Sequence, residues 1–134
     1  MNRLKSYAPV LVRVALSLVF LWFGYNQLAH PDMWIKIVPA WAGGIFGSAA
    51  IVVTINGWFE IVAGLLLIAG IQVRIVSLLL GLHLISIASG FGLSAIGIRD
   101  WGLCLATFSI FLNGPDIWSL DSTLKNKVEE IPKL

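Results

Sequence analysis

The side chains best suited to acid–base or binding chemistry in this chain stand inside or beside long apolar stretches. Glu60 is the only charged residue between positions 44 and 72, and His83 lies in an apolar run of its own. Arg99 and Asp100 directly precede a further apolar run. A carboxylate removed from water persists by pairing, by taking up a proton or by facing a water-filled cavity. These residues therefore predict a site that transfers protons or binds a small polar or quinone-like head group.

Two amide side chains are expected near Glu60. Asn56 precedes Glu60 by four residues, which places both on one face of a helix. Gln27 lies near the end of the first apolar run, on the same expected side of the membrane as Arg99. Arg99 starts about two helical turns from Glu60, so a water molecule or Asn56 is needed to bridge them. The pattern predicts a pocket that opens to the outer face, with a structural polar network as the alternative.

His83 and Asp100 each have a structural interpretation beside the functional one. An imidazole near a carboxylate can relay protons near neutral pH, but a lone histidine among hydroxyl groups more often packs through hydrogen bonds. Asp100 is interpreted first as a carboxylate near a helix N-terminus, where the helix dipole favours it. The only other histidine, His30, is expected at a different depth, which disfavours a haem with two histidine ligands. Ligands for zinc or an iron–sulfur cluster are missing, so no metal site is predicted.

The remaining reactive residue types are given structural roles. Cys104 is the single cysteine, so it can form neither an internal disulfide nor a C-x-x-C redox pair. We expect it to pack as a small apolar residue, which leaves any redox chemistry to a partner or a cofactor. Trp22 and Trp58 are interpreted as anchors at the membrane surface, the alternative being that they flank a flat ligand.

The composition places these residues in a membrane protein. Apolar residues make up 58% of the 134 residues and charged residues 12%, and six residues are tryptophan. Soluble domains carry roughly 45–50% apolar and about 25% charged residues. A soluble chain this small could not bury so much apolar surface. A soluble enzyme, a disordered linker and a secreted disulfide scaffold are therefore poor fits. The net charge of +2 and the scattered basic residues do not indicate a nucleic-acid partner.

The apolar runs predict an all-α, polytopic membrane protein with four membrane-spanning helices in an antiparallel bundle. A helix needs about 20 apolar residues to cross the hydrocarbon core. The fourth run is short, so it is expected to recruit residues 97–100 as its first turn, and Pro9 suits the first turn of the first span. We predict a single membrane domain over residues 1–134, with spans at 9–29, 48–70, 74–93 and 97–115 and a tail at 116–134.

The connections between the spans are also predicted. Residues 31–47 hold prolines and glycines, which disfavour a continuous helix, together with Trp34 and Trp41. We interpret this segment as lying at the membrane–water boundary, with a plain connecting loop as the alternative. A short turn over residues 70–74 makes spans two and three a hairpin, and the tail is expected to end in a short surface helix.

Polar and small residues share one face of each span, which predicts a partly polar bundle interior. The expected inward residues are Arg13, Ser17, Phe20, Gly24 and Gln27 on span one; Asn56, Glu60, Ala63 or Gly64, and Leu67 on span two; Leu79 or Leu80, His83, Ser86 and Gly90 on span three; and Asp100, Leu103 or Cys104, and Thr107 on span four.

The basic residues predict the orientation in the membrane. Four spans put both termini on one side, which receives seven of the basic residues, whereas the other side receives two, Lys36 and Arg99. Because cytoplasmic segments carry the excess of lysine and arginine, both termini are expected in the cytoplasm, with the protein in the cell inner (plasma) membrane. The seven are Arg3, Lys5, Arg13, Arg74, Lys125, Lys127 and Lys133.

A second polar group follows the fourth span. Gly114 and Pro115 are expected to end that helix, and Ser119 or Asp121 is expected to cap the tail helix. As an alternative, Asp121 reaches Arg13 or Arg74 at the same end of the bundle. These residues are interpreted as structural.

Taken together, these motifs resemble the DoxX family of small four-helix membrane proteins, over almost the whole chain. The resemblance is carried by Arg13 and the run Phe20-Leu21-Trp22-Phe23-Gly24 with Gln27-Leu28 and Pro31; by Glu60, Gly64, Leu65-Leu66-Leu67 and Gly70 before Arg74; by Arg99-Asp100; and by Gly114-Pro115-Asp116-Ile117-Trp118-Ser119-Leu120-Asp121. Family members often carry lysine where this chain has Gln27, so a charged partner for Glu60 from span one is absent here.

The resemblance implies an association with membrane redox systems. One branch of the family is similar to the quinone-linked subunit of thiosulfate:quinone oxidoreductase, and other members are linked to thiol or oxidative-stress handling. The leading hypothesis is therefore an oxidoreductase subunit or accessory that binds a quinone or lipid-like cofactor. Its partners would be the bilayer, redox-enzyme subunits and a second copy of the chain. A small proton-coupled transporter and a non-catalytic membrane scaffold remain alternatives.

Overall fold

The computed structural model describes residues 2–129, and these residues form helices joined by short connections. Lys133 lies outside the described residues, as does the side chain of Arg3. The helices are α1 (Asn2–Ala29), α2 (Pro31–Ile35), α3 (Ala40–Phe46), α4 (Ala49–Ala69), α5 (Val73–Phe91), α6 (Ala95–Asn113) and α7 (Leu120–Glu129).

Four of these helices, α1, α4, α5 and α6, are long and apolar enough to cross a membrane. The all-α, four-span prediction is therefore confirmed. α6 begins at Ala95, which confirms that residues before the fourth apolar run join its helix. Its 19 residues reach about 28 Å at 1.5 Å each. Arg99 and Asp100 consequently belong to a spanning helix.

Pro9 does not lie in the first turn of its helix, as expected, because α1 begins at Asn2. A proline within a helix lacks the N–H that would bond to the carbonyl four residues earlier. That carbonyl belongs to Lys5, near the end of the helix, where solvent or head groups can hydrate it. The missing bond therefore does not end the helix.

Capping residues explain where the spanning helices begin and end. Ser48 accepts a hydrogen bond from the Ile51 amide at the start of α4, and Ser94 accepts one from the Gly97 amide at the start of α6. α4 ends at Gly70, whose φ of 71° is a left-handed conformation that glycine adopts without strain. α6 ends before Gly114, as predicted.

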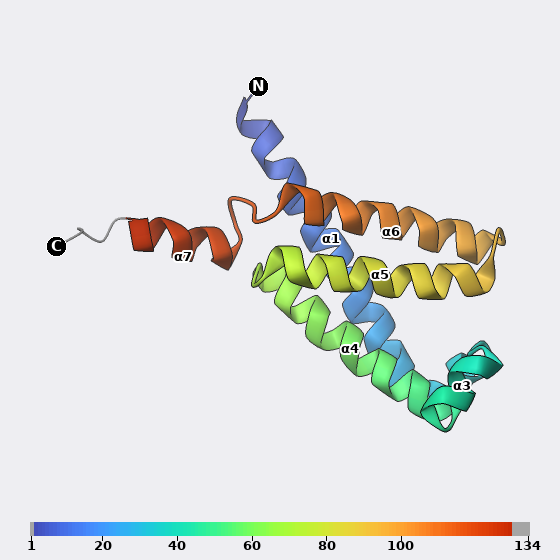
Figure 1. Cartoon of the computed structure of the whole chain (residues 1–134). Coiled ribbons are helices and arrows are strands. Elements are labelled where there is room, and N and C mark those ends of the chain that lie inside the picture. Colours follow the sequence, from blue (N-terminus) through green and yellow to red (C-terminus); the bar gives the residue numbers. More distant parts are fainter. Residues whose placement is uncertain (1, 130–134) are drawn as a thin grey trace.

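The four spanning helices form two pairs (Figure 1). α1 lies alongside α4 in the opposite direction, and α5 and α6 form an antiparallel hairpin. α4 and α5 share a short turn and then diverge, so the two pairs splay apart with distance from that turn. We call the end that carries α7 the terminal end. The end that carries α3 and the α5–α6 connection is the loop end.

Glycines bring the helices of each pair into close contact. A Cβ atom built on Gly24 would lie 2.7 Å from the carbonyl oxygen of Gly57, so α1 and α4 pack backbone against backbone. A Cβ on Gly81 would lie 3.0 Å from the ring of Phe108, which fills the space between α5 and α6. Small residues allow this approach in lipid, where no hydrophobic force drives helices together.

Arg13 joins the two pairs at the terminal end. Its Nε and Nη2 donate to the Asp116 carboxylate at 2.6 and 3.1 Å, and both side chains are buried. Its Nη1 donates to the carbonyl oxygens of Leu67 and Ile68 in the last turn of α4. The last carbonyls of a helix lack the full set of partners that its interior provides, so Arg13 also supports the end of α4.

Asp121 has a different role from the two predicted for it. Its carboxylate accepts hydrogen bonds from the backbone amides of Gln72 and Val73, which caps the N-terminus of α5. It does not pair with Arg13, because Asp116 already occupies that guanidinium. The tail helix α7 is instead capped by Ser119, whose hydroxyl accepts from the Ser122 amide. The predicted tail helix itself is confirmed, and none of its residues is buried.

The predicted inward faces are confirmed on α1 and α6 but only in part on α5. The named α1 residues, from Arg13 to Gln27, are all buried. On α5, Ser86 and Gly90 are exposed, and the buried residues are centred on Leu80 and Leu84. The reason is that α5 packs mainly against α6, so its buried face is turned toward α6. His83, Ser86 and Gly90 line the edge that faces α4 across a gap.

Candidate functional site

A cavity of about 590 Å³ lies between the two helix pairs in the loop-end half of the molecule. Its walls come from α1, α4, α5 and α6, with residues of α2 and α3 along one side. The lining is mostly aromatic and aliphatic, with a few polar side chains, as is typical of small-molecule sites. The polar lining residues include Gln27, Asn56, Glu60, His83, Ser86, Arg99 and Asp100.

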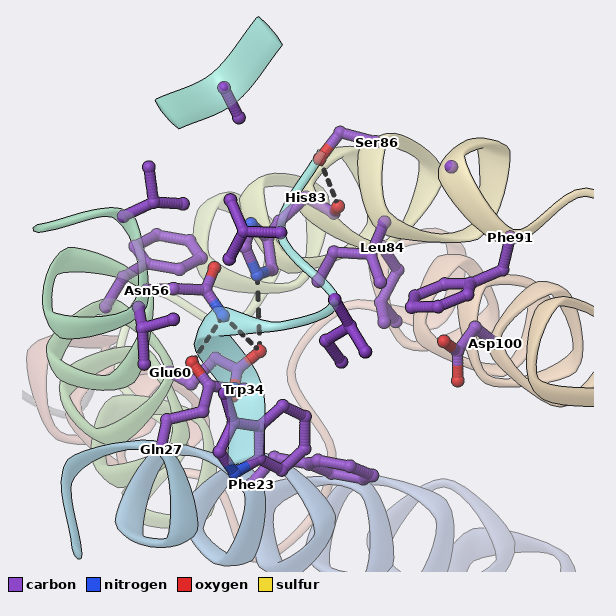
Figure 2. Close-up of a pocket in the computed structure, with 18 of the residues that line it drawn as sticks. Phe23, Gln27, Trp34, Asn56, Glu60, His83, Leu84, Ser86, Phe91 and Asp100 are labelled. Carbon is purple, nitrogen blue, oxygen red and sulfur yellow. Dashed lines mark hydrogen bonds and ion pairs between the residues drawn. The ribbon is translucent and has the colours of Figure 1, made fainter. Parts of the chain in front are cut away.

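Glu60 is the centre of the polar cluster, as Figure 2 shows. It lies in the middle of α4, and its side chain is only 4% exposed. Gln27 on α1 donates to its Oε2 at 2.9 Å, and Asn56 donates to its Oε1 at 3.3 Å. Asn56 also donates to Gln27 Oε1 at 2.6 Å. Three side chains from two helices therefore form a closed hydrogen-bonded ring that holds the carboxylate.

His83 brings a third helix to this carboxylate. Its Nε2 lies 3.2 Å from Glu60 Oε1, and its ring stands against that of Phe59 with centroids 4.9 Å apart. When the carboxylate is ionised it only accepts hydrogen bonds, and the ring nitrogen that faces it then carries the hydrogen. Within residues 2–129, the other ring nitrogen, Nδ1, has no hydrogen-bond partner, and it points away from Glu60 (Figure 2). Nδ1 is thus free to bond to a ligand.

Arg99 and Asp100 line the cavity but do not reach Glu60. Arg99 Nε lies 2.8 Å from Asp100 Oδ1, and the guanidinium stacks over the ring of Phe23, 5.3 Å from its centroid. The bridge expected between Arg99 and Glu60 is therefore not formed, because each has nearer partners. Figure 2 places Asp100 away from the Glu60 cluster.

The helix-dipole interpretation of Asp100 is wrong. α6 begins at Ala95, so Asp100 lies beyond the first turn, and its side chain is buried. The N-terminus of α6 is capped by Ser94 instead. Asp100 therefore pairs with Arg99 on the cavity wall. The Arg99 side chain remains half exposed.

The segment between α1 and α4 covers one side of the cavity, which the sequence interpretation did not anticipate. The residues of this segment that line the cavity include Trp34 on α2, Trp41 on α3, and Pro39, which directly precedes α3. Trp34 stacks edge-on against Phe23 at 5.6 Å between centroids. Trp22 and Trp58 are exposed and do not line the cavity, so the alternative that they flank a ligand there is not supported. The high density of tryptophan in residues 31–47 was the available signal.

A protein-family comparison adds to this geometry. The model of the DoxX family matches residues 8–92, which is more than half of the chain. The chain belongs to the DoxX family. No curated protein and no solved structure matches it significantly.

The DoxX match covers most of the Glu60 cluster and leaves other features outside. Gln27, Asn56, Glu60 and His83 lie within residues 8–92. Arg99, Asp100 and the Arg13 partner Asp116 lie beyond them. The family therefore includes the part of the chain that builds the polar ring, and the α6 wall of the cavity comes from the remainder.

One structural partner was missed by the sequence interpretation. Asp116, rather than Asp121, pairs with Arg13. Both aspartates follow the fourth span within eight residues of its end, so charge alone could not separate them. The distinguishing signal was position, because Asp116 follows Gly114 and Pro115 directly and stays close to the end of α6.

Proposed function

We propose that this DoxX-family protein binds a quinone-like or lipid-like molecule in its cavity as a subunit or accessory of a membrane redox system. One observation carries the proposal. A carboxylate, an imidazole and two amides converge on one wall of a cavity whose lining is otherwise mostly apolar. Such a wall suits a ligand with a polar head group and an apolar remainder.

The pair of Glu60 and His83 offers a quinone head group a hydrogen bond and a source of protons. Carbonyl oxygens accept hydrogen bonds, and reduction of a quinone to a quinol adds two electrons and two protons. With both ring nitrogens protonated, His83 donates its Nδ1 hydrogen to such an oxygen and passes it one proton, while the Glu60 carboxylate at Nε2 stabilises the imidazolium. The second proton would come from water. The electrons would come from a partner subunit, since the single cysteine cannot form a redox pair.

A second polar contact is available on the far side of the head group. Arg99 stacks on Phe23, which precedes Gln27 by four residues on α1. The guanidinium is therefore about one helical turn, roughly 5–6 Å, from the level of the polar ring. A six-membered ring with oxygens on opposite edges can contact His83 at one edge and Arg99 at the other.

Extraction of the bound molecules tests this proposal. The protein is purified from its native membrane in mild detergent, and its lipophilic contents are identified by mass spectrometry. We expect a quinone at near-stoichiometric amount. H83L is expected to weaken quinone binding about tenfold or more, because it removes a hydrogen bond to the head group. W58L, at an exposed position outside the cavity, is the control and should bind as wild type. Absence of any quinone, with H83L equal to W58L, would overturn the proposal.

A proton-coupled transporter is the second candidate, and the Glu60–His83 contact of 3.2 Å favours it. In that case Glu60 takes up the transported proton and His83 relays it. Proton flux into liposomes would then fall in E60Q. Flux that is indifferent to E60Q leaves the redox proposal as the better one.

A further inference from the structure

One side of the cavity lies between α4 and α5. α4 and α5 leave their shared turn as the two arms of a V (Figure 1). Phe59 and His83 are in contact across this V. Toward the loop end beyond that contact, the cavity is lined by Ile55 on α4 and Ser86 on α5, and both residues are exposed. We call this gap between α4 and α5, bordered by Ile55, Phe59 and Ser86, the window.

Direct contacts join α1 to α4 and α1 to α6 around the other sides of the cavity. The glycine contact between Gly24 and Gly57 seals α1 against α4. α1 and α6 are joined by Arg13 and Asp116 at the terminal end. Toward the loop end, they are joined by Arg99 stacked on the ring of Phe23.

The loop end is covered by the segment of residues 31–46, which we call the lid. Trp34 and Trp41 of the lid line the cavity. Pro39 lies against the end of α5, since a Cβ built on Gly90 would stand 3.7 Å from its Cγ. A ligand from the aqueous phase at this end would have to displace these apolar side chains.

The window has the chemistry of a passage for hydrocarbon. Its borders are two apolar residues and one hydroxyl, and Ser86 already donates its hydroxyl hydrogen to the His83 carbonyl. An apolar chain can therefore lie between α4 and α5 without leaving a polar group unpaired. The polar ring stands directly inside, because Phe59 and His83 form the inner edge of the window.

On the proposed function, the geometry points to a ligand that is dissolved in the bilayer and enters sideways between α4 and α5. It is an amphiphile with a hydrogen-bonding head and a long apolar tail. The head contacts His83, and the tail remains in the window and extends into the lipid. This assigns Ile55 and Ser86 to ligand access and tail binding, and it makes a small water-soluble molecule a poor substrate.

Two quinone probes separate this passage from the site itself. Decylubiquinone carries a ten-carbon tail and dissolves in the membrane, whereas ubiquinone-0 has no tail and arrives from water. Uptake of each by proteoliposomes is followed through quenching of tryptophan fluorescence, since Trp34 and Trp41 line the cavity. The informative quantity is the ratio of the decylubiquinone rate to the ubiquinone-0 rate.

Phenylalanine substitutions narrow the window without adding tryptophan. I55F and S86F act from opposite borders, and both positions are exposed, so no buried clash is created. We expect each to lower the rate ratio about tenfold or more. L82F is the matched control on α5, because Leu82 is exposed and does not line the cavity. It should leave the ratio unchanged.

The outcomes distinguish the two proposals. A ratio in I55F and S86F equal to that in wild type and L82F would overturn sideways access while the quinone site stands. Failure of wild-type protein to bind either probe would overturn the proposed function and this inference with it.

Discussion

At the scale of single residues, Arg13 and Glu60 show two ways of keeping a charged group within a spanning helix. Arg13 is fully engaged: four hydrogen bonds hold its guanidinium to Asp116 and to two carbonyls of α4. Glu60 is held by two neutral amides and one imidazole, whose second nitrogen is free. The first arrangement is closed and therefore structural. The second has an open bonding position that faces a cavity, which is why we place the function there.

The Arg13–Asp116 pair predicts a large effect on stability. R13A leaves the buried Asp116 carboxylate without its cationic partner and removes the donor to two carbonyls of α4, so we expect a loss of about 3–5 kcal/mol in the free energy of unfolding. Titration from mild detergent into denaturing detergent measures it. K125A is the control, because Lys125 and Glu129 form an exposed pair 3.9 Å apart and such pairs contribute about 0–1 kcal/mol. Equal losses in R13A and K125A would contradict the structural role of Arg13.

The candidate site residues named from the sequence do line one cavity, but some of their pairings were not foreseen. Asn56 and Glu60 were linked because a spacing of four is fixed by helix geometry. The contact between Glu60 and His83 depends on how α4 and α5 are rotated about their axes. The sequence does not determine the rotation of α5, because apolar residues lie on several of its faces. Gln27, on a third element, reaches the carboxylate as a neutral donor.

At the scale of helices, the spans were predictable because long uncharged runs have few alternatives in a membrane. Their ends were less predictable: α1 continues through Pro9, and α6 starts at Ala95, two residues before the predicted start at 97. The short helices α2 and α3 were foreseen as an interrupted segment. Their position over the cavity depends on tertiary packing, because nothing in the sequence of residues 31–47 says which side of the bundle they cover.

The seam between α1 and α4 predicts a selective sensitivity to added methyl groups. In G24A the new Cβ would lie 2.7 Å from the Gly57 carbonyl oxygen, so the two helices must separate. We expect a loss of about 1–3 kcal/mol, measured in the same detergent titration. Gly102 on α6 provides the control, because nothing lies within 4 Å of the Cβ that alanine would add there. G102A should be neutral or stabilising by up to about 1 kcal/mol. Equal changes in the free energy of unfolding for G24A and G102A would show that close packing of α1 against α4 does not contribute to stability.

At the scale of the whole molecule, the two helix pairs are fastened at the terminal end and separate toward the loop end. Arg13 with Asp116, and Asp121 at the N-terminus of α5, all lie at the terminal end. The cavity lies in the other half, where α4 and α5 have diverged. A bundle packed evenly along its length would have no room for a ligand. The uneven fastening therefore explains why the polar ring is accessible at all.

The orientation of this asymmetric molecule decides which side of the membrane the cavity serves. Among the described residues, basic side chains concentrate at the terminal end, so we predict that this end is cytoplasmic. Single cysteines test this in intact cells with a membrane-impermeant maleimide, and Cys104 is too buried to interfere. G44C on the lid should be labelled, because its side chain would meet open space, and K125C on α7 should be labelled only after lysis. Labelling of K125C in intact cells and of G44C only after lysis would place the lid in the cytoplasm. Protons would then reach His83 from the cytoplasm, and a quinone reduced in the cavity would draw its protons from that side of the membrane.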